Sequence, residues 1–551
     1  MALSLSRTLR RQVKEALKTI EVFVNSVQPS KDNTGWDNIR DKFNELNVNL
    51  TEMIGKLNQD NETDSHDHDR TKSGVIEDYG KFMTRVSKNR NPSALRELAT
   101  LYYSMPESLF LGVGTPNSDL YPFKSVHVNL KNGTTLKMSG DPLKMVLSYL
   151  PSAGYAPLQT IFKDLQDKFH GPQDWAVKDV LITSGAQEGT ALTINMLLNP
   201  GDPLLVQNPV YPGFAEIIRP MEVDAIPVNV DGDGMVPEHL IQILEERSKM
   251  TDKPMPKSIY INPTASNPTG TLLSDDRKKQ IYAIAQRYGL IILEDDPYYF
   301  VHFRDRDPVS FLSMDTDYRV IRFDSFSKTL SAGLRLGYVT APKPFIDRIN
   351  LHMQVTTMHA SGLPQLLIYE LLSQWGYEGY CQHLVEVRKF YKRRRDITLQ
   401  AAETYLKGLC TWNIPQGGMF LWVTIIHPVQ DLRHFITVES LKEKVIVAPG
   451  YAFNLDPTNV GINQQNFRIS YSVASEEDLT EGIKRLGKLI KENQSKSFAD
   501  RPEKSLLGNL NCTVTSRHND IFFVTAGIRT RALRMLHECS DHCAMGAHNY
   551  A

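Results

Sequence analysis

Residues 320–338, VIRFDSFSKTLSAGLRLGY, indicate the fold class of this chain. The stretch begins as an apolar run and continues as a turn rich in hydroxyl groups, with Lys328 after two serines and Arg335 seven residues later. A strand that ends in reactive side chains is typical of an open sheet whose carboxyl ends face a ligand. A lysine that forms an imine must lose its proton part of the time, which burial and nearby cations favour. Taken alone, Lys328 is more simply interpreted as a surface lysine that closes a strand.

The sequence on both sides of this stretch alternates short apolar runs with helical patterns, from about residue 78 to about residue 493. The apolar runs are 180–182, 204–206, 259–261, 290–293 and 320–323. Strands that alternate with helices predict a largely parallel sheet covered on both faces. Beyond residue 423 helices mix with short strands, which indicates a smaller second domain.

Two other predicted strands also end in polar residues. Asp295 follows the run 290–293. Its carboxylate could pair with the protonated nitrogen of a bound pyridine ring, which takes up electrons only while that nitrogen stays protonated. An aspartate that caps the next segment is the simpler alternative. Asn267, within NPTASNPTG at 262–270, could donate to a phenolate oxygen, although Asn-Pro-x-Gly is also an ordinary turn sequence.

Two further elements suit a phosphorylated, flat ligand. The segment 183–189, TSGAQEG, separates a strand from an amphipathic helix, so its backbone N–H groups and the helix N-terminus predict an anion site. Ser325 and Ser327 could add hydroxyl donors. Tyr211 follows the next strand and could stack on a ring, although a half-buried tyrosine is common.

These five elements, in this order, resemble the pyridoxal-phosphate-dependent aminotransferases of fold type I, class I/II. The resemblance runs from about residue 87 to about residue 492 and is strongest to the kynurenine/2-aminoadipate branch, which is akin to fungal aromatic aminotransferases. It also rests on 91–96 (NPSALR), 116–124 (PNSDLYPFK), 149–154 (YLPSAG), 294–300 (EDDPYYF) and 417–422 (GGMFLW).

The resemblance implies an α/β fold with two domains. A large, mostly parallel-sheet domain would span about 140–355, and a smaller α+β domain would combine about 78–139 with 356–494. A helical extension (1–57) and a polar linker (58–77) would precede this aminotransferase unit of 78–494, and an irregular tail (495–551) would follow it.

The resemblance also implies roles around the cofactor, pyridoxal 5'-phosphate. Lys328 would hold the cofactor covalently and move the substrate's α-proton, while Asp295 would keep the pyridine nitrogen protonated. Asn267 and Tyr298 would hydrogen-bond the ring oxygen, and Tyr211 would stack on the ring. The phosphate would be bound by the backbone of Ala186 and Gln187 and by Ser325, Ser327 and Arg335. The branch usually has serine at position 186, so one hydroxyl donor is lost there.

For the substrate, the resemblance makes Arg468, in FRISY at 467–471, the anchor of the α-carboxylate, which its planar fork matches. A lone arginine in a strand is otherwise usually a surface residue. Arg96 and Tyr149 would supply substrate and cross-subunit contacts. Tyr149 would reach the neighbouring subunit's phosphate, so a homodimer is expected, and Gly114 would leave room for a long or aromatic side chain.

The predicted reaction transfers the amino group of an L-amino acid to a 2-oxo acid such as 2-oxoglutarate. The donor would be 2-aminoadipate, kynurenine or an aromatic amino acid. A pyridoxal-phosphate lyase acting at Cα is an alternative, because the cofactor commits the enzyme only to chemistry at that carbon. A Mediator-type transcription or interaction protein that carries this domain is another.

The N-terminal extension leaves the compartment open. Basic residues at helical spacing in 1–24 fit a mitochondrial presequence or an ordinary amphipathic helix. A second helical pattern at 36–57 predicts an interaction hairpin with a protein partner, faintly similar to Mediator subunit 8 through Trp36 and Phe43. A mitochondrial or cytoplasmic location is expected, and a nuclear one if the extension is a Mediator-type module.

The composition argues against several other classes of protein. The 551 residues include 62 basic and 63 acidic side chains, so the protein has no overall positive charge with which to bind nucleic acid. No apolar run reaches the roughly 18 to 20 residues of a membrane span. With five cysteines a disulfide framework is not expected. His537, Cys539, His542 and Cys543 fit no common zinc spacing, so no metal site is predicted.

Overall fold

A computed structural model of the chain describes residues 75–95, 98, 105, 107, 109, 111–112, 114–456 and 465–499. The predictions for the helical extension 1–57, its presequence and Mediator-like alternatives, most of the linker, Arg96, the cysteines and histidines of 537–543 and the tail beyond residue 499 lie outside these residues. Within them, no helix is long and apolar enough to cross a membrane, and no group of three or more His, Cys, Asp or Glu side chains could hold a metal ion.

The larger part of the fold is an eight-stranded sheet in the order β3-β10-β9-β8-β7-β4-β5-β6. Strands β5, β4, β7, β8 and β9 pair in parallel, β10 runs antiparallel to β3 and β9, and β6 runs antiparallel to β5. The strands are β3 Lys178–Thr183, β4 Pro203–Asn208, β5 Asp224–Asp231, β6 Gly234–Met235, β7 Ser258–Ile261, β8 Ile291–Asp295, β9 Val320–Ser325 and β10 Gly337–Pro342.

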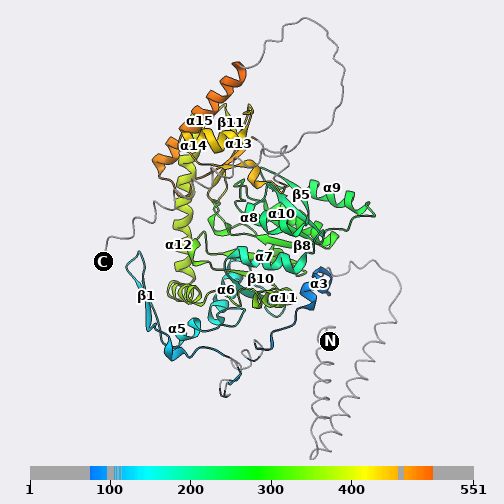
Figure 1. Cartoon of the computed structure of the whole chain (residues 1–551), viewed down its shortest axis with the longest axis vertical. Helices are drawn as coiled ribbons and strands as arrows, with labels where there is room; N and C mark the ends of the chain where they lie inside the picture. The colour runs from blue at the N-terminus through cyan, green and yellow to red at the C-terminus, as the bar shows by residue number, and fades with distance from the viewer. Residues whose placement is uncertain are drawn as a thin grey trace, which may run out of the picture.

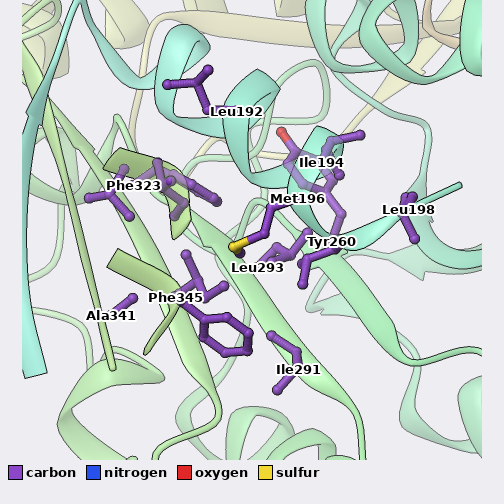
Figure 2. Packing of buried hydrophobic residues seen from close by; sticks show 14 of the residues in the cluster. Leu192, Ile194, Met196, Leu198, Tyr260, Ile291, Leu293, Phe323, Ala341 and Phe345 are labelled. Atoms are coloured by element: carbon purple, nitrogen blue, oxygen red, sulfur yellow. The ribbon is translucent and has the colours of Figure 1, made fainter. Parts of the chain in front are cut away.

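Both faces of this sheet are buried because helices pack on each of them, and neighbouring residues of a strand point to opposite faces. In β8, Ile291 and Leu293 join one apolar cluster with helices α7, α8 and α11, while Ile292 joins another with α9 and α10. Figure 2 shows part of the first cluster, where Met196 of α7 lies among strand residues that include Tyr260. The helices are α7 Ala186–Leu197, α8 Pro212–Ile218, α9 Pro237–Ser248, α10 Asp275–Tyr288 and α11 Lys343–Gln354.

The smaller part contains an antiparallel sheet in the order β11-β12-β14-β13, which packs against α15 and the end of α12. Helix α12 is long and, in Figure 1, runs from the region of α5 and α6 to that of α14 and α15. The elements are α12 Gly362–Tyr405, β11 Cys410–Trp412, β12 Phe420–Ile425, α13 Leu432–His434, α14 Ser440–Lys442, β13 Ala448–Pro449, β14 Asn466–Ser470 and α15 Glu476–Ala499.

The segment before the large sheet forms a two-stranded hairpin and short helices. The hairpin residues Leu136 and Met138 pack in one cluster with Val180 of β3 and Tyr338 of β10. These elements are α3 Arg85–Asn89, β1 Ser125–Asn129, β2 Thr135–Ser139, α5 Gly140–Leu147 and α6 Ala156–His170.

The predicted fold class is confirmed. The five apolar runs coincide with β3, β4, β7, β9 and most of β8, and the change of pattern beyond residue 423 falls in the smaller sheet. The residue limits of the two domains remain a prediction.

Candidate active site

The parallel strands of the large sheet all end along one edge, where a cavity of about 330 Å³ opens. Strand β10 runs in the opposite direction, so Arg335, just before its first residue, lies at the same edge. The cavity is lined by Ala186, Gln187, Tyr211, Asn262, Asn267, Asp295, Pro297, Tyr298, Ser325, Ser327, Lys328, Ala332, Arg335, Phe420 and Arg468.

Asp295, the last residue of β8, lies buried in the wall of this cavity. Its Oδ2 accepts a hydrogen bond of 2.5 Å from the hydroxyl of Tyr260, and its backbone oxygen accepts one of 2.6 Å from Asn262 Nδ2. Its Oδ1 is buried without a hydrogen-bond partner. Burial raises the pKa of Asp295 to about 6, against the lowering by the Tyr260 hydrogen bond and by Arg322. A carboxylate held in this way suits a cationic N–H donor.

Lys328 follows β9 and is positioned by the turn that the two preceding serines begin, where Ser327 N donates 3.2 Å to Ser325 Oγ. Its Nζ lies 5.6 Å from the centre of the Tyr298 ring. The pKa of Lys328 is lowered by burial first, then by the positive charges of Arg468 and Arg335, while Asp295 opposes the shift. These are the conditions under which a lysine becomes a nucleophile and a base.

An anion site lies at the N-terminus of α7. The backbone of Ala186 and Gln187 opens the helix there, and Arg335 Nη1 lies 3.4 Å from Ser327 Oγ. Gly185 has a φ of +83°, and a Cβ at this position would lie 2.7 Å from Arg335 Nη2. Glycine is therefore required for the guanidinium to approach the helix terminus. Helix N–H groups, hydroxyls and a guanidinium together match a phosphate.

Arg468 of β14, in the smaller sheet, also lines the cavity. Its Nη1 donates 2.6 Å to Asn267 Oδ1, and its guanidinium carbon lies 3.9 Å from the centre of the Phe420 ring and 4.9 Å from that of Phe453. Its Nε is buried without a partner. The small sheet thus presents a partly satisfied guanidinium to the cavity, which suits a carboxylate.

The structure brings most of the predicted site residues together at one cavity. These are Ala186, Gln187, Tyr211, Asn267, Asp295, Tyr298, Ser325, Ser327, Lys328, Arg335 and Arg468. Tyr149 and Gly114 do not line it: Tyr149 is 46% exposed, and the Cα of Gly114 has open space where a Cβ would stand. Arg96 lies outside the described residues.

Sequence reasoning missed several residues of the site. The cavity is also lined by Asn262, Pro297, Ala332 and Phe420, and Tyr260 contacts Asp295 from behind. Asn262 and Phe420 lie in two stretches quoted above, 262–270 and 417–422. Asn262 directly follows β7 and Phe420 begins β12, so their position beside a strand was the available signal. Tyr260 carried none, because its partner depends on how β7 aligns with β8.

The fold is α/β, and its cavity places a helix N-terminus, two arginines and a buried lysine together, an arrangement that suits an enzyme with an anionic ligand. The chain belongs to the aminotransferases: the family described as "Aminotransferase class I and II" matches residues 144–486.

Relatives agree with this family. The chain is 41% identical over 429 residues to "Kynurenine/alpha-aminoadipate aminotransferase, mitochondrial" of Mus musculus, covering 75% of this chain and 99% of that protein. It is 35% identical over 423 residues to "Aminotransferase tdiD" of Emericella nidulans, covering 74% and 95%. Nothing among these relatives supports a lyase or a transcription protein.

Solved structures agree as well. The aminotransferase Aro8 of Candida albicans has a TM-score of 0.69 and 28% identity, with 76% of this chain and 99% of that chain covered. A Pyrococcus horikoshii kynurenine aminotransferase in complex with PMP has a TM-score of 0.59 and 29% identity, covering 76% and 98%. The predicted family and enzyme class are therefore confirmed.

The cofactor of this family is pyridoxal 5'-phosphate, and the residues of the cavity fit it. The unpartnered Oδ1 of Asp295 suits the protonated ring nitrogen, the N-terminus of α7 with Arg335 suits the phosphate, and Lys328 suits the aldehyde. The missing hydroxyl at Ala186 leaves the backbone amides in place.

Proposed function

We propose that this aminotransferase moves the amino group of kynurenine, 2-aminoadipate or an aromatic L-amino acid to a 2-oxo acid such as 2-oxoglutarate. The donor class is supported by the relatives of this chain, which include kynurenine/alpha-aminoadipate and aromatic amino acid aminotransferases. The observation that carries the proposal is the buried, unpartnered Asp295 Oδ1 in a cavity that also holds Lys328 and Arg468.

When bound, pyridoxal 5'-phosphate supplies an aldehyde and a ring that takes up electrons from the substrate's Cα. Lys328 Nζ binds the cofactor and carries the α-proton of the substrate, because its pKa is lowered by burial and by Arg468. Asp295 holds the proton on the ring nitrogen. Asn267 and Tyr298 would donate to the ring oxygen, and Tyr211 would pack on the ring.

The two anions are bound by different residues of the cavity. Ala186 and Gln187 with Ser325, Ser327 and Arg335 bind the phosphate, and Arg468 binds the substrate's α-carboxylate. Because Asn267 already occupies one Arg468 nitrogen, the arginine is oriented before the substrate arrives. Arg96 and Gly114 are proposed to contact the substrate side chain.

We also propose a homodimer in which Tyr149 reaches the phosphate of the neighbouring subunit. The support is its 46% exposure, away from the cavity of its own chain. A mitochondrial location is proposed because the mammalian relatives are named as mitochondrial enzymes. Multi-angle light scattering and fractionation of cells expressing the full chain test these two proposals.

The proposed function is tested on purified full-length protein loaded with pyridoxal 5'-phosphate. Borohydride treatment followed by peptide mapping should label Lys328. Addition of kynurenine, 2-aminoadipate or phenylalanine should convert the bound cofactor to its pyridoxamine form without loss of the side chain, and 2-oxoglutarate should restore it. Label on another lysine, or release of a side-chain fragment, would contradict the proposal.

Replacing Arg468 by lysine should raise KM for the amino donor about ten- to hundredfold, with a smaller effect on kcat. Lysine keeps the charge but loses the two parallel hydrogen bonds to a carboxylate, and hydrogen bonds to charged groups contribute about 1.5–3 kcal/mol. Steady-state kinetics with varied donor measure this change. Arg433 offers a matched control, because it belongs to α13 and does not line the cavity. An unchanged KM for Arg468→Lys would remove Arg468 from the carboxylate site.

A further inference from the structure

Tyr260 is a buried phenol that the reaction described above does not use. Its ring is 1% exposed and lies in the cluster of Figure 2, stacked on Phe214 with ring centres 3.5 Å apart and planes at 10°. Burial and stacking therefore fix the position of the Tyr260 ring. Its hydroxyl reaches Asp295 Oδ2 at 2.5 Å.

The sheet geometry brings these two residues to the same side. Strands β7 and β8 are parallel, and Tyr260 pairs in register with Leu293. Tyr260 and Leu293 both face the cluster with α7, and Asp295, two residues after Leu293, continues on that side. The hydroxyl of Tyr260 therefore reaches the carboxylate diagonally from the neighbouring strand.

Among the described residues, Asp295 forms no ion pair that could hold its negative charge. The nearby cation Arg322 is fully buried and lies 3.1 Å from Glu294, 3.3 Å from Asp296 and 2.9 Å from Asp324. Its charge is already shared by three carboxylates. Tyr260 is thus the side chain that hydrogen-bonds the Asp295 carboxylate directly.

We propose that Tyr260 is a positioning residue of the aminotransferase, which holds Asp295 as a carboxylate and leaves its Oδ1 for the cofactor's protonated ring nitrogen. A phenol donates its O–H to Oδ2 and so favours the charged form. Oδ2 accepts from Tyr260, whereas Oδ1 has no hydrogen-bond partner and can accept from the ring nitrogen. This inference rests on the proposed role of Asp295 and adds a residue that acts only through it.

The experiment compares two cofactor analogues on cofactor-free protein. Pyridoxamine 5'-phosphate has the ring nitrogen, and its 1-deaza analogue has a C–H in that place. We expect wild type to bind the first more tightly. In Tyr260→Phe, binding of pyridoxamine 5'-phosphate should weaken about ten- to hundredfold, because a hydrogen bond to a charged group is lost, while binding of the 1-deaza analogue should stay unchanged. Isothermal titration calorimetry measures both affinities without any turnover.

Tyr282→Phe is the matched control: the Tyr282 hydroxyl also donates 2.5 Å to a carboxylate, but that carboxylate belongs to Asp317, which, unlike Asp295, does not line the cavity. It should leave both affinities unchanged. Phe214→Leu loosens the stacked ring but keeps the hydroxyl, so it should weaken binding of pyridoxamine 5'-phosphate alone and to a smaller extent. It also serves if Tyr260→Phe does not fold.

The outcomes separate the two proposals. Equal weakening of both analogues in Tyr260→Phe would mean that Tyr260 only supports the packing, and unchanged binding of both would mean that Asp295 does not need it. Either result overturns the inference and leaves the proposed function standing. A wild-type protein that binds both analogues equally would instead overturn the role of Asp295 itself.

Discussion

Replacing Lys328 by alanine should reduce amino-group transfer by at least about 10⁴-fold while cofactor binding stays measurable. Lys328 lines the cavity, and its pKa is lowered by burial and by two arginines. No other described lysine lines the cavity, so no side chain of the same chemistry can replace it. The phosphate site and Asp295 remain, which is why binding should survive.

Single-turnover kinetics of the variant, preloaded with pyridoxamine 5'-phosphate and mixed with 2-oxoglutarate, measure the loss. Lys343→Ala is the control, because Lys343 belongs to α11 and donates 2.9 Å to the backbone oxygen of Ala176, away from the cavity. Activity within tenfold of wild type in Lys328→Ala would remove Lys328 from the mechanism. Partial rescue by added methylamine would support its role as the proton carrier.

The sequence alone could predict the sheet and much of its active edge. Five apolar runs marked buried strands; Asp295 is the last residue of one strand, and Lys328 and Asn267 lie in the loops that follow two others. Parallel strands place such ends side by side, so local signals sufficed to gather them.

Other parts of the site depend on long-range geometry. Arg468 meets Asn267 across 201 positions of sequence, and only the family resemblance singled it out. Tyr260 was missed because its contact with Asp295 follows from the register of β7 and β8, which no local pattern encodes. Tyr149 and Gly114 lie away from the cavity of their own chain, so their predicted roles require a substrate or a second subunit.

Replacing Asp295 by asparagine should have opposite effects on activity and on stability. We expect transfer to fall about 10²- to 10³-fold, because a neutral amide no longer favours a proton on the ring nitrogen. The isosteric amide oxygen can still accept from Tyr260, so the fold should be kept. Turnover with saturating cofactor measures the loss, and an unchanged rate would exclude Asp295 from catalysis.

The cofactor-free variant should at the same time be more stable than wild type above pH 6. The pKa of Asp295 is raised from 3.8 to about 6, first by burial, so the folded chain binds a proton more tightly than the unfolded chain does. Stability of the wild type is therefore lost as pH rises from about 4 to about 6, by on the order of 3 kcal/mol. Asparagine does not ionise and avoids this loss. The difference in unfolding free energy should vanish near pH 4 and narrow once pyridoxal 5'-phosphate is bound.

Denaturant unfolding of both cofactor-free proteins across pH 4 to 8 measures this difference. Asp231→Asn provides the contrast, because hydrogen bonds from Arg277 lower the pKa of Asp231, so its neutralisation should not stabilise the fold at any pH in this range. If Asp295→Asn were no more stable than wild type at pH 7.5, the carboxylate would be adequately solvated without a cofactor. The Asp295 carboxylate would then not depend on a bound cation for its stabilisation. A gain that disappears on cofactor binding would instead mean that the buried charge lowers the stability of the empty enzyme and is stabilised by the ring nitrogen that it binds.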